Sequence, residues 1–258
     1  MTSPLWRLRT LLYPFLWVPR TKYEGLLQRC SPGTHEAGES LLLKHLNRCN
    51  SVLDLGSGTG AWLARMKKHG FTGLNAVELD TENFSVPGVE PLPIDLNSAF
   101  SRHFDKSFQL VTAIEIIEHL DCPRHFLREI HRLLSGDGYL LLTCPNVGHW
   151  MGRMRFLLWG ELRMFDALNY RSQRHISPIT DAQIRQMFRE TGFRLIGSTT
   201  AGNSHGCVLR IATSPARLLF RIAAGRQTDG DVAIYLARKS APDSESRGRD
   251  SLYFRRSW

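Results

Sequence analysis

Cysteine is sparse in this chain, and no two cysteines stand at the C-x-x-C spacing of a metal or redox site. The five cysteines lie at positions 30, 49, 122, 144 and 207 of the 258-residue sequence. Scattered thiols of this kind argue against a zinc cage. They are also typical of proteins from a reducing compartment, so we expect reduced thiols in a cytoplasmic protein.

Long hydrophobic runs are also absent. The apolar N-terminal stretch, residues 5–19, mixes Leu, Trp and Phe with Arg7, Arg9 and Pro14. It is too short and too interrupted to cross a bilayer, which takes about 20 apolar residues. It also lacks the small-residue cleavage site of a signal peptide. Its composition would suit peripheral contact with a membrane interface, but we favour a helix that packs over a substrate pocket.

Acidic residues are outnumbered by basic ones, which leaves a formal net charge of +9. Such a charge would suit nucleic acid, an anionic membrane surface or an acidic small molecule as a partner. The basic residues are spread along the chain, however, and no compact nucleic-acid-binding motif is present. We therefore interpret most of the charge as a solvated surface and do not expect nucleic acid as a partner.

A glycine-rich turn within SVLDLGSGTG, residues 51–60, is the most informative feature of the sequence. It follows a short apolar strand and precedes a helix expected over residues 61–68. Glycine lets a backbone approach a ligand closely, and nucleotide-like ligands dock at such strand ends in α/β sheets. The spacing is G-x-G-x-G and not the G-x-G-x-x-G of dinucleotide sites; an ordinary strand–helix turn is the alternative. The expected cofactor-binding residues here are Asp54, Gly56, Ser57, Gly58 and Gly60.

An acidic residue stands at the spacing of a ribose contact. Residues 74–80 indicate a second apolar strand that ends in acid, and Glu78 lies twenty-two residues after Gly56. In related folds an acidic side chain meets a nucleoside ribose at a spacing of about 20 residues. A carboxylate suits a cis-diol because it only accepts hydrogen bonds. We expect Glu78 to bind a ribose, whereas Asp80 fits a solvated acid in the following turn.

These features together resemble the class I S-adenosylmethionine (SAM)-dependent methyltransferases. The turn resembles their motif I, and residues 127–146, LREIHRLLSGDGYLLLTCPN, resemble their late core, with a helix ending at a turn over 135–138 and a strand from 139. In that family an acidic residue accepts a hydrogen bond from the adenine amino group, and Asp95 matches this position. Gln109 departs from the usual Asp of the central strand. The resemblance implies SAM as the cofactor.

The run EIIEH, residues 115–119, directly follows the central strand and should lie in the binding crevice. Glu115 is expected to line the cofactor cleft, and Glu118 and His119 are candidate catalytic residues. Three interpretations stay open: Glu118 and His119 order the loop, His119 acts as a general base, or the three residues bind Mg²⁺, Mn²⁺ or Zn²⁺. The run resembles the ubiquinone-biosynthesis and small-RNA 2′-O-methyltransferases, where it is associated with divalent metals. We assign no metal.

Residues 147–178 form a connection much longer than the usual 2–6 residues, which predicts a lid. Its aromatic residues would supply an apolar pocket, and its arginines could clamp a carboxylate or phosphate. His149 and His175 are spare bases, and His149 is taken as a catalytic candidate. The aromatic residues are Trp150, Phe156, Trp159, Phe165 and Tyr170, and the arginines are Arg153, Arg155, Arg163, Arg171 and Arg174.

The lid also resembles the methionine-biosynthesis W protein, a methyltransferase-fold relative that works with homoserine acyltransferase. The alternative function is therefore a partner or regulatory protein without turnover. An RNA methyltransferase is the second alternative. The retained E-x-x-E-H run favours an active enzyme. The composition of the lid and the resemblance to the quinone enzymes favour a small-molecule acceptor that is methylated through oxygen.

We predict an α/β fold: a Rossmann-like, seven-stranded, mostly parallel sheet with helices on both faces and the last strand antiparallel. Cap helices are expected over 1–48, the methyltransferase domain over 49–240, and a disordered polar tail over 241–258. A capping box at Thr180 should open a helix that closes at Gly192. In-line transfer of an activated methyl group needs mainly alignment and exclusion of water.

Overall fold

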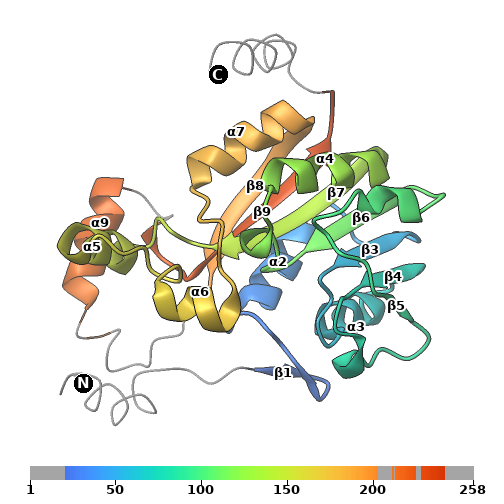
Figure 1. Cartoon of the computed structure of the whole chain (residues 1–258), viewed down its shortest axis with the longest axis horizontal. Helices are drawn as coiled ribbons and strands as arrows, with labels where there is room; N and C mark the ends of the chain where they lie inside the picture. Colours follow the sequence, from blue (N-terminus) through green and yellow to red (C-terminus); the bar gives the residue numbers. More distant parts are fainter. Residues whose placement is uncertain (1–20, 203–210, 212, 225–227, 242–258) are drawn as a thin grey trace.

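The computed structural model describes residues 21–202, 211, 213–224 and 228–241. Its centre is a seven-stranded sheet of order β5-β4-β3-β6-β7-β9-β8 (Figure 1). The strands are β3 (Val52–Leu55), β4 (Leu74–Val77), β5 (Pro91–Leu92), β6 (Phe108–Ala113), β7 (Leu134–Pro145), β8 (Phe193–Ala201) and β9 (Val232–Lys239). β9 runs antiparallel to both β7 and β8, while β3 to β7 are parallel. The predicted fold is confirmed.

Helices cover both faces of the sheet, which a buried parallel sheet requires. On one face α4 (Pro123–Leu133) and α7 (Asp181–Thr191) pack against Leu53 and Leu55. On the other, α2 (Thr34–Leu43) and α3 (Ala61–Lys68) pack against Val52. All four residues of β3 are buried, so this strand contributes to both cores and holds the turn that follows it.

The capping residues that the sequence predicted lie at the two ends of α7. The Thr180 hydroxyl accepts a hydrogen bond from the Gln183 amide, and the Gln183 side chain accepts one from the Thr180 amide. The helix ends at Gly192, whose φ of 86° is left-handed. The predicted capping box and stop are confirmed.

Residues 135–138 do not form the predicted turn. α4 ends at Leu133 and β7 begins at Leu134, so these residues extend the strand. The pairing with β6 is irregular between Phe108 and Leu110. A Cβ at Gly138 would lie 3.0 Å from the Phe108 carbonyl oxygen. Glycine here permits close packing of two strands. The prediction of a turn from this glycine is therefore wrong.

The remaining elements lie outside the sheet and the four helices that cover it. The chain before α2 forms a hairpin of β1 (Lys22–Tyr23) and β2 (Leu26–Leu27), so the described part of the predicted helical cap contains a hairpin and one helix. The predicted lid contains α5 (Trp150–Trp159) and α6 (Ala167–Gln173), and α9 (Ser214–Ala224) lies between β8 and β9. Three short 3₁₀-helices are η1 (Thr81–Asn83), η2 (Phe100–His103) and η3 (Ile117–His119).

Within these described ranges, no helix has both the length and the apolar character needed to span a bilayer. The expectations for residues 5–19 and for the tail beyond Ala241 concern segments outside the described residues.

Candidate active site

A cavity of about 1130 Å³ opens at the carboxyl ends of β3, β4 and β6. The glycine turn forms one side, the segment after β6 forms the floor, and α6 with the end of the lid closes the other side. Residues of β2 and of the segment that follows it, for which the sequence indicated no role in a site, also line the cavity: Leu27, Arg29, Cys30, Ser31, Pro32 and His35. A single ligand usually occupies about 300–1000 Å³, so the cavity has room for two ligands.

The glycine turn has the backbone geometry that its sequence predicts. Gly56, Gly58 and Gly60 have φ values of 73°, 56° and 84°. Gly60 is the N-cap of α3, and a Cβ there would lie 2.2 Å from Val86 Cγ2. Only glycine fits such a position without displacement of its neighbours. Gly60 therefore shapes the turn, although it does not itself line the cavity.

Asp54 anchors the turn from inside the sheet. Its side chain is buried, and the Thr112 hydroxyl donates to its Oδ1 at 2.6 Å. The Ser57 hydroxyl donates to the Asp54 carbonyl at 2.9 Å. Burial raises the pKa of Asp54 to about 6, because the charged form is poorly solvated there. Asp54 and Ser57 also line the cavity.

Glu78 joins the end of β4 to the glycine turn. The Gly58 amide donates to its Oε2 at 2.6 Å, and the Asp80 amide donates to its Oε1 at 3.2 Å. Glu78 lines the cavity. Carboxylate oxygens accept more than one hydrogen bond each, so Glu78 has acceptor capacity left for a ligand.

Asp95 lies apart from these residues. Its side chain is exposed, its Oδ1 accepts from the Asn97 amide at 2.9 Å, and it does not line the cavity. The structure thus gives Asp95 the geometry of a turn residue, and its assignment to adenine stays a prediction.

Glu115 occupies a strained backbone position at the floor of the cavity. Its φ is 53°, in the left-handed region that non-glycine residues rarely adopt. The Thr143 hydroxyl accepts from the Glu115 amide and donates to Glu115 Oε1, both at 2.9 Å. Burial, with a further contribution from the charge of Asp231, raises the pKa of Glu115 to about 7. Such strain, about 1–3 kcal/mol, persists where the surroundings over-determine it, often at functional sites.

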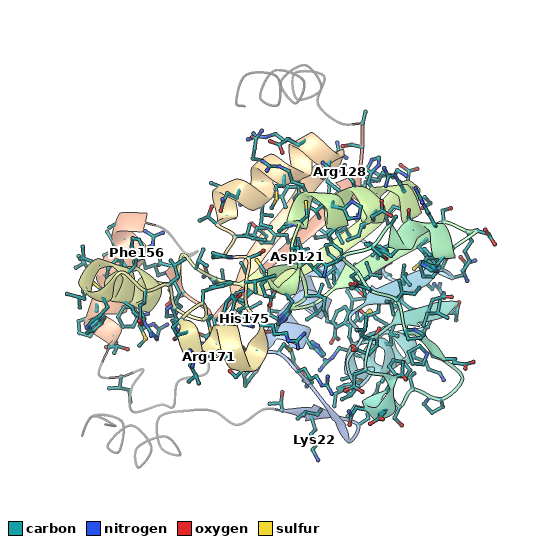
Figure 2. The ribbon with its side chains drawn as sticks, in the orientation of Figure 1. Lys22, Asp121, Arg128, Phe156, Arg171 and His175 are labelled. Atoms are coloured by element: carbon teal, nitrogen blue, oxygen red, sulfur yellow. The ribbon has the colours of Figure 1, made fainter. Side chains whose placement is uncertain are left out.

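A carboxylate and two imidazoles meet beside Glu115. The ligand atoms of Glu118, His119 and His175 all lie within 4.8 Å of one another. His175 comes from the end of the lid, and Figure 2 labels it near α6 at the centre of the molecule. Glu118 is fully buried, and its two carboxyl oxygens have no hydrogen-bond partner among the described residues. A buried, unpartnered carboxyl group that lines a cavity is expected to serve a ligand.

Hydrogen bonds fix the tautomers of the two imidazoles. His119 Nδ1 lies 3.2 Å from the Arg174 carbonyl oxygen, and His175 Nδ1 lies 2.8 Å from the Met164 carbonyl oxygen. A carbonyl only accepts, so each Nδ1 must carry the proton, which leaves each Nε2 with a free lone pair. His119 Nε2 is 3.8 Å from Glu118 Oε1.

Burial favours the neutral form of all three side chains, Glu118, His119 and His175. It raises the pKa of Glu118 well above its ordinary value, and the charge of Glu115 adds to this effect. It lowers the pKa of His119 and of His175. A neutral imidazole can accept a proton from a substrate, and carboxylate plus imidazole is also a donor set for divalent metals.

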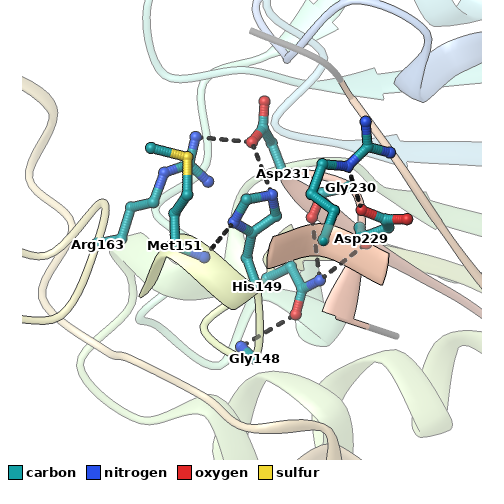
Figure 3. A network of polar contacts seen from close by, with 9 residues as sticks. Gly148, His149, Met151, Arg163, Asp229, Gly230 and Asp231 are labelled. Carbon is teal, nitrogen blue, oxygen red and sulfur yellow. Dashed lines mark hydrogen bonds and ion pairs between the residues drawn. The ribbon is translucent and has the colours of Figure 1, made fainter. Parts of the chain in front are cut away.

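His149 does not line the cavity; it belongs to a buried network at the start of the lid (Figure 3), which reaches the cavity through Arg163. As N-cap of α5 it accepts a hydrogen bond from the Met151 amide at its Nδ1, at 3.2 Å. Its Nε2 is 4.0 Å from Asp231 Oδ1, and Arg163 Nη2 is 2.7 Å from the same oxygen. His149 therefore helps to anchor the start of the lid to Asp231, the residue before β9, and its assignment as a catalytic base stays a prediction.

The aromatic residues of the lid do not form the predicted pocket, because none of the five lines the cavity. Three of them, Phe156, Trp159 and Tyr170, are exposed. Trp150 packs on Phe220 instead. Composition predicts an apolar lid, but it does not specify the direction in which the side chains of α5 and α6 point.

Two arginines of the lid, Arg155 and Arg163, do line the cavity. Both are already paired: Arg155 with Glu161 at 2.6 Å and Asp166 at 3.0 Å, and Arg163 with Asp231. The predicted clamp for an anionic substrate would therefore have to compete with these carboxylates.

Comparison with known proteins agrees with this geometry. A family model described as "Methyltransferase domain" matches residues 20–197, well over half of the chain. The ubiquinone biosynthesis O-methyltransferase of Maricaulis maris (strain MCS10) is 27% identical over 152 residues, which cover 56% of this chain. The match spans 59% of that relative's length.

Solved structures share the fold. A SAM-dependent methyltransferase from Archaeoglobus fulgidus superposes with a TM-score of 0.56 at 18% identity, covering 80% of this chain and 95% of that one. A Haloferax volcanii methyltransferase in complex with the activator Trm112 gives 0.54 at 17% identity, covering 81% and 89%. The chain therefore belongs to the methyltransferase-domain family and is a class I enzyme that uses SAM as methyl donor.

Proposed function

We propose that this enzyme transfers a methyl group to an oxygen atom of a small-molecule acceptor bound between the glycine turn and the lid. The observation that carries the proposal is the cluster of Glu118, His119 and His175, in which the two neutral imidazoles offer proton acceptors on the lid side of the cavity. A hydroxyl must lose its proton as it is methylated, whereas a neutral amine need not lose it first. A built proton acceptor thus favours oxygen.

The residues on the other side of the cavity fit SAM. A turn of positive-φ glycines borders the cavity, and the Glu78 carboxylate beside it has acceptor capacity for a ribose cis-diol. We assign the methionine portion to Asp54, Gly56, Ser57, Gly58 and Gly60 with Glu115, the ribose to Glu78 and the adenine to Asp95. When bound, SAM supplies a methyl group already activated on a sulfonium, so no nucleophilic side chain is required.

His119 is the proposed general base. Its Nδ1–H donates to the Arg174 carbonyl, and this bond orients the ring and leaves the Nε2 lone pair to take the acceptor proton. Its lowered pKa keeps the imidazole neutral near pH 7. The Glu118 carboxyl lies 3.8 Å from this Nε2, and we assign it to orient the His119 ring. His175, which the sequence indicated as a spare base, also donates from its Nδ1 to a carbonyl, that of Met164, and is a second candidate acceptor of the proton.

The lid would exclude water during transfer. The Ile176 and Ser177 amides donate to the Glu118 carbonyl at 3.0 and 2.9 Å, and the Ser177 hydroxyl donates to the Leu120 carbonyl at 2.7 Å. These bonds fasten the end of the lid to η3, next to the proposed base. Expulsion of water strengthens the electrostatic interactions inside a site.

The expected setting is the cytoplasm. Cys30, Cys49, Cys122 and Cys144 are free thiols, in keeping with a reducing compartment.

A kinetic comparison of His119→Gln with His125→Gln tests the proposal. His125 is the control because its Nε2 also contacts a carbonyl, that of Ser98, but it lies outside the cavity. Turnover is measured with labelled SAM in fractionated metabolite extract, with and without Mg²⁺ and after treatment with a chelator. We expect His119→Gln to lower kcat by about 10²–10⁴-fold with SAM affinity unchanged, and His125→Gln to behave as the wild type.

Undiminished turnover by His119→Gln would show that His119 is not the general base. Loss of all turnover in the chelator, restored by Mg²⁺, would replace the base by a metal held by the same three side chains. SAM binding without turnover in any extract would favour the partner-protein alternative, and methyl incorporation only into RNA would favour the RNA alternative.

A further inference from the structure

Two short helices of the structure expose large apolar side chains to solvent. We name this region the α5–α9 surface. It comprises, with their exposed fractions, Phe156 (55%), Leu157 (76%), Leu158 (59%) and Trp159 (69%) from the last turn of α5, and Leu218 (59%), Leu219 (67%) and Ile222 (76%) from α9.

The two helices lie together at one end of the molecule. Trp150 of α5 and Phe220 of α9 have ring centroids 6.3 Å apart. Figure 1 shows both helices beyond the edge of the sheet, and Figure 2 labels Phe156 at that end. Leu218, Leu219 and Ile222 follow helical spacing, so α9 turns an apolar stripe outward. Contiguous exposed apolar surface of this kind marks an interaction site.

The charged residues of α5 and α9 are all basic. α5 and α9 carry four arginines and no Asp or Glu. Arg155 and Arg217 pair with carboxylates of neighbouring loops. Within the part of the chain that the structure describes, Arg153 and Arg221 form no ion pair, and both are exposed. The apolar side chains are therefore flanked by cations without counter-charge.

We propose that the α5–α9 surface docks this protein onto an anionic lipid membrane. Leu, Phe and Trp side chains bury favourably at the boundary of headgroups and acyl chains, and arginines reach lipid phosphates with their long stems. The net charge of +9 adds a long-range attraction to an anionic bilayer. The surface differs from residues 5–19, the only segment in which the sequence indicated membrane contact.

A second copy of this chain is a poorer occupant. A symmetric contact through the same face would place the arginines of both copies near one another, and these helices offer no carboxylate to pair them. Like charges brought together across an interface are repulsive.

Docking would bring the lid close to the bilayer. Arg155 of α5 contacts Asp166, the N-cap of α6, at 3.0 Å. Leu168 in the first turn of α6 is 63% exposed and also lines the cavity. The apolar surface thus continues toward the rim of the cavity.

Co-sedimentation of the full chain with lipid vesicles tests the proposal. The vesicles contain phosphatidylcholine alone or mixed with phosphatidylglycerol, each at low and high salt. We expect binding to the mixed vesicles that weakens with salt. The double variant Leu157→Glu, Leu219→Glu should bind at least about tenfold more weakly, since each change removes a leucine from the apolar contact.

Leu79→Glu is the matched control, because Leu79 is 66% exposed but lies at the end of β4, away from the two helices. It should bind vesicles as the wild type does. Circular dichroism and thermal melting establish that the variants are folded, which is expected because only exposed positions are changed.

Three results would overturn the proposal. The wild type does not bind the mixed vesicles; the double variant binds them as well as the wild type, which would assign membrane contact to another segment; or the wild type self-associates in sedimentation velocity and the double variant does not, which would assign the surface to a second copy.

Discussion

Replacement of Asp231 by Asn should destabilise the enzyme strongly, because it removes the negative charge that lies against the buried guanidinium of Arg163. The Asp231 side chain is 2% exposed and that of Arg163 is 9% exposed, and Nη2 and Oδ1 are 2.7 Å apart. His149 shares the same carboxylate oxygen at 4.0 Å. Removal of one partner of a buried ion pair costs about 3–5 kcal/mol, since the other charge stays desolvated.

Asp229→Asn provides the matched control two residues away. Asp229 pairs with Arg217 at 3.0 Å, but the two side chains are 25% and 30% exposed. A pair this accessible is worth about 0–1 kcal/mol. The two variants therefore remove the same charge from the same loop and differ in burial.

The assay is urea unfolding followed by circular dichroism, with limited proteolysis of the lid as a second readout. We expect Asp231→Asn to lower the free energy of unfolding by about 3–5 kcal/mol and to speed cleavage within residues 147–178. Because the charge of Asp231 raises the pKa of Glu115, that pKa should also fall in the variant. Equal, small losses in both variants would refute the inference that this network anchors the lid.

Two further predictions concern the glycine turn. The pKa of Asp54 is about 6 in the folded protein against an ordinary value of 3.8, so the folded state holds the extra proton between these values and stability falls as pH rises through this window. Asp54→Asn keeps an acceptor for Thr112 but cannot ionise; its free energy of unfolding relative to wild type should therefore rise by about 2 kcal/mol from pH 4 to pH 7, and a pH-independent difference in urea unfolding would contradict the burial argument. Gly60→Ala should cost at least about 2 kcal/mol more than Gly70→Ala, because both have φ above 80° but only Gly60 would press a Cβ against Val86; equal midpoints in thermal melts would contradict this.

Local signals in the sequence were sufficient to predict the glycine turn with its flanking strand and helix, and the capping of α7. The strand–turn–helix around Asp54 and the capping box of α7 depend on residues a few positions apart, so their chemistry could be read directly. The spacing of Glu78 from the turn also follows from the parallel pairing of β3 with β4. The structure accordingly brings Glu78 to the Gly58 amide.

The rest of the site depends on contacts between distant parts of the chain. His149 meets Asp231 only because β9 inserts next to β7, and nothing near either residue indicates this pairing. His175 joins Glu118 through backbone bonds of the segment that follows it. Which lid aromatics face the cavity depends on the rotation of each helix, which composition does not specify. Residues 135–138 read as a turn because two glycines suggest one, whereas close pairing with β6 uses them in a strand.

Calorimetric titration with SAM and S-adenosylhomocysteine of the wild type, Glu78→Ala and Glu82→Ala tests the central claim most directly. Glu82 is an exposed acid in η1, four residues beyond Glu78, and serves as the control. Hydrogen bonds to a charged group are each worth about 1.5–3 kcal/mol, so Glu78→Ala should weaken binding by at least about tenfold while Glu82→Ala binds as the wild type. Absence of binding by the wild type, or equal affinities in all three proteins, would contradict the assignment of this cavity to SAM.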